Sequence, residues 1–290
     1  MRGAFINGRD LAQTLKTRLF ALTHRLEKET GIRPGLAVLR IGTDPASQIY
    51  VTRKGAQARE LGYHFEEHTY PTTISPEVLK TAIEGLNQNP AIHGIILQLP
   101  LPAPLDPLAF LSLIEPAKDV DGLHPLNAGK LFQGLPSGFT PCTPLGCLAL
   151  LKTVHSDFKG LTAGVVGRSL LVGRPMGMLL LEQGCTLWMA HSQTRNLPEL
   201  CQTADILVVA IGKPHFIQGN WIKKGATVID VGMNRLPSGD ITGDVDFKAA
   251  CAQTDAITPV PGGVGPMTIA SLLRNTLEAA CRYAGHPFTL

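Results

Sequence analysis

The chain of 290 residues lacks the features of a membrane, secreted or nucleic-acid-binding protein. No run of about 18 apolar residues occurs, so the sequence predicts no membrane span. Residues 1–10 lack the long apolar core of a signal peptide, which indicates a cytoplasmic protein. The formal net charge of +3 is small and dispersed, so we expect no nucleic-acid partner.

The chain also lacks a recognisable metal site. Its six cysteines contain no C-x-x-C pair, so we expect reduced, partly buried thiols and no zinc. Asp119 and Asp121 offer two carboxylates in a loop, but a metal would require more ligands nearby. A single carboxylate that accepts a hydrogen bond from a ligand amine is the better interpretation, and the sequence predicts no bound metal.

The first half of the chain contains an alternation of strands and helices. Leucines recur every three or four residues between Asp10 and Gly31, which predicts an amphipathic helix with Asp10 as its cap. The segments that follow predict a parallel sheet with crossover helices. The expected strands are residues 36–41, 64–70 and 94–100, and the expected helices are 46–61 and a segment that begins at 75.

The alternation restarts after residues 122–138, which are rich in Gly and Pro and are expected to form loops and a domain crossover. A helix is predicted from Thr143 to about Val154. The strands expected beyond it suit a doubly wound nucleotide-binding fold. One begins at residue 164, and the others are 186–190, 206–211 and 226–231.

These patterns predict an α/β protein of two domains with a cleft between them. The first is an N-terminal α/β catalytic domain, residues 1–140, to which a C-terminal helix at 268–290 returns. The second, residues 141–267, is a Rossmann-like, doubly wound domain that is expected to bind a dinucleotide. A chain of this length is sufficient for two hydrophobic cores.

The candidate phosphate-binding element is the stretch 164–175. It joins an expected strand to an expected helix at 176–181, so backbone N–H groups and the helix dipole would face an anion. The spacing is not the usual G-x-G-x-x-G, because Arg168 and Ser169 occupy the place of a second glycine. The stretch is therefore either a dinucleotide turn with added polar side chains or a plain strand-to-helix turn.

A missing carboxylate indicates which dinucleotide is preferred. Domains that bind NAD carry an acid about twenty positions after the glycine turn, whereas residues 189–195 contain hydroxyls and an arginine. With Arg168, Arg174 or Arg195, these groups suit a 2′-phosphate, so we expect NADP rather than NAD. His191 as a catalytic base is the weaker interpretation of this segment.

Tyr50 and Lys54 lie four positions apart on an expected helix, so they project from the same face. They follow a strand and a turn, at the carboxyl edge where open α/β sheets bind ligands. A lysine partly desolvated beside an aromatic ring is suited to proton transfer near neutral pH. Gln98, at the end of an apolar strand, would face the same crevice. Solvated side chains at all three positions are the alternative interpretation.

With these residues considered together, the chain resembles the bifunctional methylenetetrahydrofolate dehydrogenase/cyclohydrolase family over essentially its whole length. Each matching segment alone is modest evidence, but their occurrence in one order is highly specific. The segments are residues 47–54, 94–102, 118–127, 141–146, 164–175, 191–194, 212–214, 230–235, 243–247 and 259–268.

The resemblance implies an NADP-dependent oxidation of 5,10-methylenetetrahydrofolate, followed by hydrolysis of the methenyl product to 10-formyltetrahydrofolate. Tetrahydrofolate derivatives are then the small-molecule partners, and a homodimer through the NADP domain is expected. By the same resemblance Lys54 is the catalytic lysine, Gln98 tunes it, Tyr50 stacks along the folate and Asp121 binds the pterin.

The resemblance also implies the residues that bind each ligand. The folate would contact Tyr50, Gln98, Leu99, Pro100, Asp121, Pro261, Gly262 and Gly263. The cofactor would contact Gly167, Arg168, Ser169, Ser192, Met233 and Thr268. Met233 departs from the isoleucine that the family commonly has, a swap that should conserve volume. The glutamate tail of folate needs a basic rim, for which the candidates are Arg9, Arg40 and Arg53.

Two alternative functions remain open from the sequence. A two-domain dehydrogenase acting on a hydroxy or amino acid would be active without folate, and it would have no use for Gln98 beside Tyr50 and Lys54. A non-catalytic NADP-sensing module would bind NADP but give no absorbance change with methylenetetrahydrofolate.

Overall fold

The structure, a computed structural model, describes residues 4–290 and divides into two units. The six-stranded unit contains the N-terminal segment through Gln13 and Pro141–Ser271, and the three-stranded unit contains Thr14–Thr140 and Leu272–Leu290. Two long helices each begin in the six-stranded unit and end in the three-stranded unit. They are α1 (Gly8–Thr30) and α10 (Val264–Tyr283).

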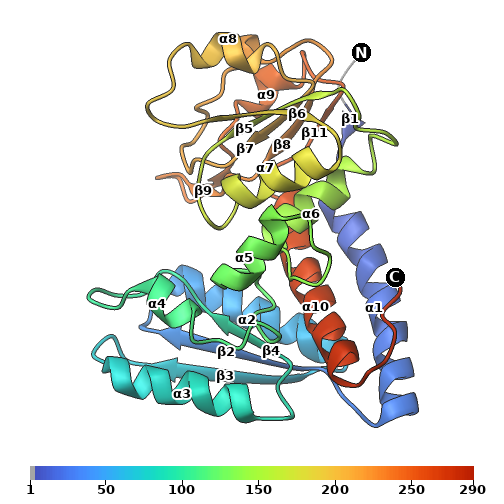
Figure 1. Ribbon diagram of the computed structural model, residues 1–290. Coiled ribbons are helices and arrows are strands. Elements are labelled where there is room, and N and C mark those ends of the chain that lie inside the picture. Colours follow the sequence, from blue (N-terminus) through green and yellow to red (C-terminus); the bar gives the residue numbers. More distant parts are fainter. Residues whose placement is uncertain (1–3) are drawn as a thin grey trace. The chain divides into compact units, whose positions relative to one another are not determined.

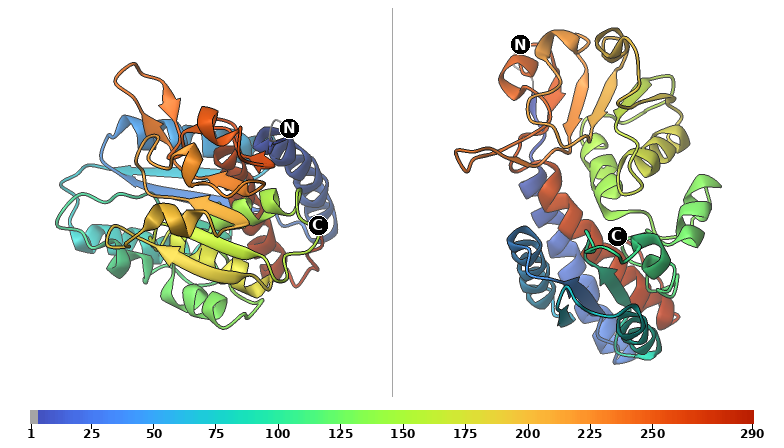
Figure 2. Two further views of the ribbon diagram at one scale, coloured as in Figure 1. Left: turned by 90° about the horizontal axis from the view of Figure 1, so that it is seen from above. Right: turned by 90° about the vertical axis from the view of Figure 1, so that its left-hand side faces the viewer.

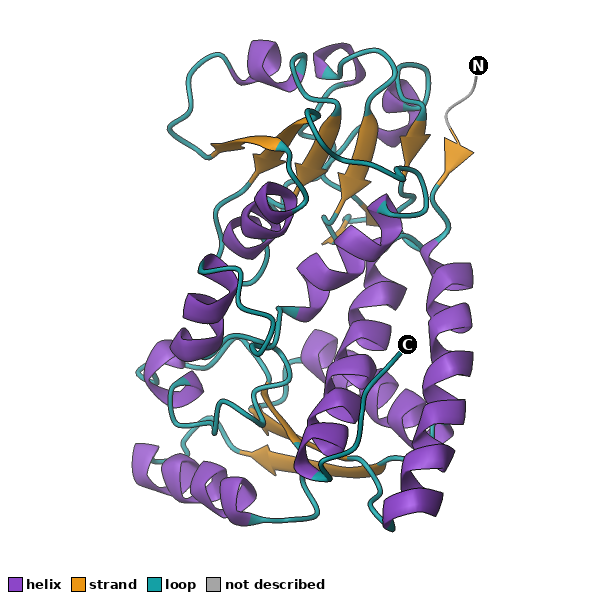
Figure 3. Ribbon diagram, turned by 45° about the vertical axis from the view of Figure 1, so that its right-hand side comes forward, coloured by secondary structure: helices purple, strands orange, loops and turns teal. Residues whose placement is uncertain are grey.

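The six-stranded unit is built on a parallel sheet in the order β1–β11–β8–β7–β5–β6, whose strands lie side by side in Figure 3. The chain order reverses at β5, because β6 lies on one side of it and β7 on the other. The carboxyl ends of strands at such a switch point form the usual ligand crevice of open α/β sheets. The strands are β1 (Ala4–Phe5), β5 (Thr162–Val166), β6 (Thr186–Ala190), β7 (Ile206–Val209), β8 (Thr227–Asp230) and β11 (Ala256–Ile257).

Apolar side chains explain why the central strands of this sheet form. Strand β7 reads Ile-Leu-Val-Val and is buried along its whole length, as expected of a parallel strand covered on both faces. Its residues Leu207 and Val209 share one core with Val228 and Ile257. The remaining elements of the unit are α6 (Cys142–Leu151), α7 (Gly173–Glu182), α8 (Leu197–Cys201), a 3-10 turn (Gly219–Trp221), β9 (Asn234–Arg235), β10 (Ile241–Thr242) and α9 (Phe247–Ala250).

The three-stranded unit places β2 (Gly35–Ile41) between β3 (His64–Tyr70) and β4 (Gly94–Leu97), all parallel. Helix α3 (Pro76–Gln88) lies along this sheet, and its buried leucine and isoleucine side chains pack on those of β2 and β4 (Figure 1). Helices α1 and α10 run alongside each other within this unit (Figures 1 and 2). The other helices are α2 (Pro45–Glu60), α4 (Pro107–Leu111) and α5 (Pro125–Phe132).

Local sequence determines where the helices of this unit begin. The carboxylate of Asp44 accepts a hydrogen bond from the Ser47 amide at the start of α2. The hydroxyl of Ser75 accepts one from the Val78 amide at the start of α3. Both caps are followed by a proline, whose missing N–H costs nothing in the first turn.

The structure corrects two expectations about local structure. Asp10 does not cap the first helix: α1 begins at Gly8, and Asn7 Oδ1 accepts hydrogen bonds from the Arg9 and Asp10 amides. Residues 122–138 are not all loop, because they contain α5, whose start is capped by His124 Nδ1.

The unit boundaries also differ from the expected domains 1–140 plus 268–290 and 141–267. The first 13 residues group with the six-stranded unit because β1 pairs with β11 of that unit. Within α10, the boundary between the two units lies after Ser271 rather than before Thr268. Among residues 4–290, no helix is both long and apolar enough to cross a membrane. All six cysteines are free thiols, and only Cys251 is not fully buried.

Candidate functional sites in the two units

In the three-stranded unit, the structure brings Tyr50, Lys54 and Gln98 together. Lys54 is buried, with 5% of its surface exposed, and its Nζ donates a hydrogen bond of 3.0 Å to Gln98 Oε1. The ammonium group also lies 4.5 Å from the centre of the Tyr50 ring. The amide Nε2 of Gln98 donates to the Leu99 carbonyl at 2.9 Å, which fixes which amide atom faces the lysine.

The topology explains why these three side chains meet. Helix α2 follows β2, and Gln98 follows β4, the strand that pairs directly with β2. Both segments leave the same carboxyl edge of the sheet, since the strands are parallel. Gln98 and Leu99 are half-buried and Pro100 is exposed, so the segment after β4 presents side chains to solvent at this edge.

Asp121 lies in a loop of the same unit that is held in place by buried neighbours. The carboxylate of Asp119 accepts hydrogen bonds from the amides of Leu123 and His124 and from Asn127 Nδ2, at 3.1, 2.8 and 2.8 Å. Asn275 Nδ2 donates to the Val120 carbonyl at 2.9 Å. Asp121 itself is half-buried between these anchored residues.

In the six-stranded unit, the turn after β5 leads closely past the end of β7 into helix α7. Gly167 has φ +126°, and a Cβ there would lie 2.3 Å from the Ala210 carbonyl oxygen at the end of β7. Ser169 Oγ accepts hydrogen bonds from the amides of Val172 and Gly173, which start α7. Arg168 and Ser169 are exposed. The turn therefore lies at the β5–β7 switch point and leads directly into a helix N-terminus.

The other residues expected at the cofactor belong to the same unit. Ser192 is exposed and follows the carboxyl end of β6. Met233 follows β8 and is 62% exposed. Thr268 Oγ1 lies 3.1 Å from Thr143 Oγ1 on α6.

The segment expected to contact folate from the far end of the chain, residues 261–263, lies in the six-stranded unit. Gly262 has φ +115°, and the Gly263 amide donates to the Pro259 carbonyl at 2.8 Å. Gly8 contacts this turn so closely that a Cβ on it would lie 1.8 Å from the Gly263 carbonyl oxygen. The start of α1 is therefore packed against the turn.

The candidates for the basic rim are not equivalent. Arg40 is 8% exposed, and its guanidinium donates to Glu67, to the Gly42 carbonyl and to Thr69. Its donors are directed into the protein, so it is not available to a folate tail. Arg9 and Arg53 have exposed side chains.

Comparison with known protein families finds two family models that match the chain. The model of the NAD(P)-binding domain of tetrahydrofolate dehydrogenase/cyclohydrolase matches residues 141–284, and the model of the catalytic domain matches residues 6–121. The chain belongs to this family.

Individual members of the family match almost the whole chain. A "Bifunctional protein FolD" of Rhodospirillum centenum is 53% identical, over 97% of this chain and 95% of the relative. The structure of the bifunctional FolD from Campylobacter jejuni is 42% identical with a TM-score of 0.94, over 96% of this chain and 99% of that one. The FolD of Trypanosoma brucei, solved with NADP and an inhibitor, is 36% identical with a TM-score of 0.93, over 97% and 98% of the two chains.

Two buried carboxylates of this family member received no role from the sequence. Asp230 and Asp244 are 2% and 0% exposed, and each accepts hydrogen bonds from several backbone amides. The sequence signal was an aspartate directly beside a glycine, as in Gly243–Asp244, but such pairs also occur in ordinary turns. The amides that donate to Asp230 and Asp244 are evident only from the fold.

Proposed function

We propose that the chain oxidises 5,10-methylenetetrahydrofolate to 5,10-methenyltetrahydrofolate with NADP and hydrolyses that product to 10-formyltetrahydrofolate. Membership of the tetrahydrofolate dehydrogenase/cyclohydrolase family supports both reactions. The observation that carries the proposal at the residue level is the contact of Lys54 Nζ with Gln98 Oε1 beside the Tyr50 ring. Such a buried lysine, oriented by an amide, is suited to move protons in both steps.

The six-stranded unit supplies the binding site for NADP in this proposal. The residues fit a dinucleotide, because Gly167 leaves no space for a Cβ and the helix α7 begins at the adjacent turn. Bound NADP would supply the hydride acceptor for the oxidation of the folate. Gly167, Arg168 and Ser169 would bind its phosphates, while Ser192, Met233 and Thr268 would contact the rest of it.

The three-stranded unit supplies the folate chemistry. Tyr50 would stack along the substrate, Asp121 would accept a hydrogen bond from the pterin amine, and Leu99 and Pro100 would line the same edge. Hydride removal leaves a cationic amidinium, which is already electrophilic. Water would add to the methenyl carbon and lose a proton to Lys54 in its amine form. One carbon–nitrogen bond would then break: the departing nitrogen keeps the electron pair and takes back the proton from Lys54, while the hydroxyl loses its own proton to become the formyl carbonyl.

An absorbance assay tests the proposed function. The purified chain is mixed with methylenetetrahydrofolate and NADP, and the methenyl product is followed as it appears and decays. NAD in place of NADP should support a slower reaction. Activity on a hydroxy or amino acid without folate, or NADP binding without an absorbance change, would each overturn the proposal.

We further propose a cytoplasmic homodimer formed through the six-stranded unit. Strand β6 supports this, because it is the outermost strand of the sheet and its Leu187, Trp188 and Met189 are only half-buried in the single chain. An outer parallel strand with apolar side chains is normally covered. Sedimentation equilibrium at low protein concentration tests the dimer, and a clean monomer would refute it.

A further inference from the structure

The carboxylate of Asp244 accepts hydrogen bonds from backbone amides that lie far from it in sequence. Its Oδ2 accepts hydrogen bonds from the amides of Ile211 and Gly212 at 2.7 and 2.9 Å. Its Oδ1 accepts from the Lys213 amide at 2.8 Å and from Asn234 Nδ2 at 2.8 Å. With the side chain fully buried, all of its acceptor capacity is used by two loops.

Asp230 extends this arrangement. Its Oδ1 accepts from the amides of Gly232 and Asp244, and its Oδ2 accepts from the Val245 amide, each at 2.9 Å. Burial raises the pKa of this carboxyl to about 6, despite the amides that stabilise its charge. The hydrogen bond from the Asp244 amide places the two carboxylates in one connected cluster.

Two glycines allow the carboxylates to lie directly against the backbone. A Cβ on Gly232 would lie 2.3 Å from Asp244 Oδ1, and a Cβ on Gly243 would lie 1.9 Å from Asp230 Oδ2. Neither distance is possible between non-bonded atoms. The cluster is therefore a closely fitted assembly, and any side chain at either glycine would separate the carboxylates from their amides.

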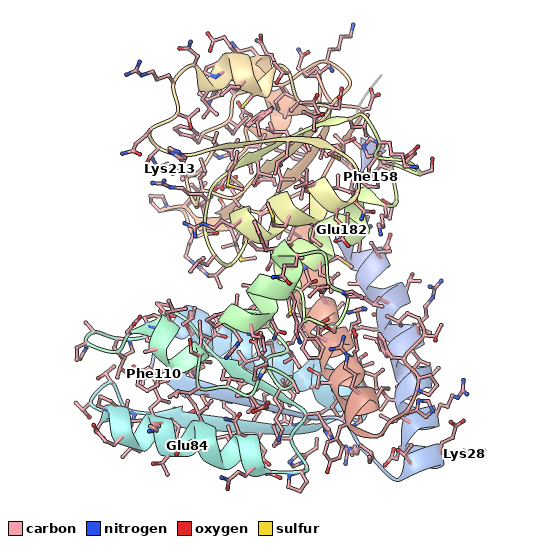
Figure 4. All side chains as sticks on the ribbon, viewed as in Figure 1. Lys28, Glu84, Phe110, Phe158, Glu182 and Lys213 are labelled. Atoms are coloured by element: carbon pink, nitrogen blue, oxygen red, sulfur yellow. The ribbon has the colours of Figure 1, made fainter. Side chains whose placement is uncertain are left out.

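The two loops that Asp244 joins are those next to the proposed NADP site. Residues 211–213 follow β7 and Ala210, whose carbonyl packs against Gly167 of the proposed phosphate-binding turn. Gly232 and Asn234 flank Met233, which follows β8. Figure 4 shows Lys213 on the outside of the six-stranded unit, so the held loop is open to solvent on its other side.

We infer that Asp244 is a positioning residue for the cofactor, which fixes the loop after β7 and the Met233 loop in the arrangement that binds NADP. The inference rests on the proposed function of the six-stranded unit. Asp244 acts through these loops and is not expected to touch the cofactor. Its loss should therefore weaken NADP binding while leaving the proton-transfer group around Lys54, which lies in the other unit, in place.

The central test is Asp244→Asn in the full chain. An amide has one acceptor oxygen and presents its NH₂ group to N–H donors, so two of the four hydrogen bonds are lost. We expect the dissociation constant for NADP, measured by calorimetry, to rise on the order of tenfold or more. The ratio of dehydrogenase activity to methenyl hydrolysis should fall by a similar factor, and amide hydrogen exchange at 211–213 should accelerate.

Two further variants keep this test decisive. Asp240→Asn makes the same chemical change in the exposed segment between β9 and β10 and should leave NADP affinity and both activities at wild-type values. If Asp244→Asn does not fold, Asn234→Ala removes only one partner of Asp244 and should raise the NADP dissociation constant by a smaller factor.

Three results separate the possible failures. Unchanged NADP affinity in the Asp244→Asn and Asn234→Ala variants would overturn the inference. A parallel fall of both activities with unchanged NADP affinity would also overturn it, since that pattern indicates general destabilisation. Failure of the wild-type chain to bind NADP or to form the methenyl product would instead overturn the proposed function.

Discussion

Lys54 Nζ and Gln98 Oε1 lie 3.0 Å apart, although 44 residues separate them in the chain. The contact places the single buried lysine of α2 against an amide that is itself held by the Leu99 carbonyl. A hydrogen-bonded pair of this kind limits the rotamers of the lysine and directs its nitrogen. The lysine is thus positioned before any substrate binds.

Replacing Lys54 with alanine should abolish methenyl hydrolysis. Removal of a positioned proton-transfer group lowers rates by about 10²- to 10⁴-fold, and Lys54 is the lysine that donates to Gln98 Oε1. The decay of methenyltetrahydrofolate absorbance measures the effect. NADP affinity should remain near the wild-type value, and Lys80→Ala, on the exposed face of α3, is the matched control. Unchanged hydrolysis in Lys54→Ala would contradict the assignment.

Gln98→Ala should impair the same step less severely. The lysine remains but loses the acceptor that directs it, so we expect hydrolysis to slow by about tenfold, as for the loss of a hydrogen bond to a charged group. The change should appear mainly in kcat if orientation is the cause. Gln88→Ala, exposed at the end of α3, controls for the substitution itself. A rise in KM with kcat unchanged would assign Gln98 to substrate binding alone.

Cofactor preference should depend on one or more of three exposed arginines, Arg168, Arg174 and Arg195. Loss of a charge-assisted contact to a 2′-phosphate should lower kcat/KM for NADP by about 10- to 100-fold and leave the value for NAD nearly unchanged. Steady-state kinetics of each alanine variant with both dinucleotides measures this ratio, with Lys224→Ala as control. If all three variants retain the wild-type ratio, the 2′-phosphate is recognised elsewhere.

Tyr63→Phe should destabilise the three-stranded unit without altering either activity. The Tyr63 side chain is 1% exposed, and its hydroxyl donates to the Leu273 carbonyl on α10 at 3.0 Å. Removing a buried hydroxyl together with its hydrogen bond costs about 1 kcal/mol of the free energy of unfolding, since the Leu273 carbonyl keeps its bond within the helix. Urea unfolding measures the difference, and Tyr283→Phe, at a residue that is 59% exposed, should show none.

The sequence predicted those elements whose pattern is long and local. Residues of β2, β3 and β5–β8 form apolar or alternating runs, and the turn at Gly167 was recognisable from its glycine between a strand and a helix. Strands β1 and β11 were missed because each has two residues, too few for any periodicity. They exist through pairing with each other and with β8.

The sequence also identified residues more readily than their contacts. Tyr50 and Lys54 were paired from helix spacing, and Gln98 was placed near them because parallel strands share a carboxyl edge. The amides that donate to Asp244 lie 31 to 33 positions earlier in the chain. They belong to the backbone, which carries no residue-specific signal. Arg40 was a plausible ligand group until the structure showed its donors occupied by Glu67, Gly42 and Thr69.

The buried side chain of His93 should make the stability of the protein depend on pH. His93 is 3% exposed, and burial, with a smaller effect of the positive charge of Lys118, lowers its pKa to about 4. Its Nδ1 accepts a hydrogen bond from the Gly35 amide, so the native ring is neutral. The unfolded chain binds a proton at this histidine below its ordinary pKa of about 6.5, whereas the native state does not until about pH 4.

The contribution of His93 to the free energy of unfolding must therefore decrease as the pH falls from about 6.5 to 4. Between pH 7 and pH 5 the loss from His93 amounts to roughly 2 kcal/mol. His93→Asn retains an acceptor for the Gly35 amide but does not titrate. The free energy of unfolding of the variant should therefore lack this part of the dependence on pH. Urea unfolding across the pH range measures the difference between the two proteins, with the exposed His24→Asn as control. Equal slopes for wild type and His93→Asn would mean that the native ring takes up its proton as readily as the unfolded one.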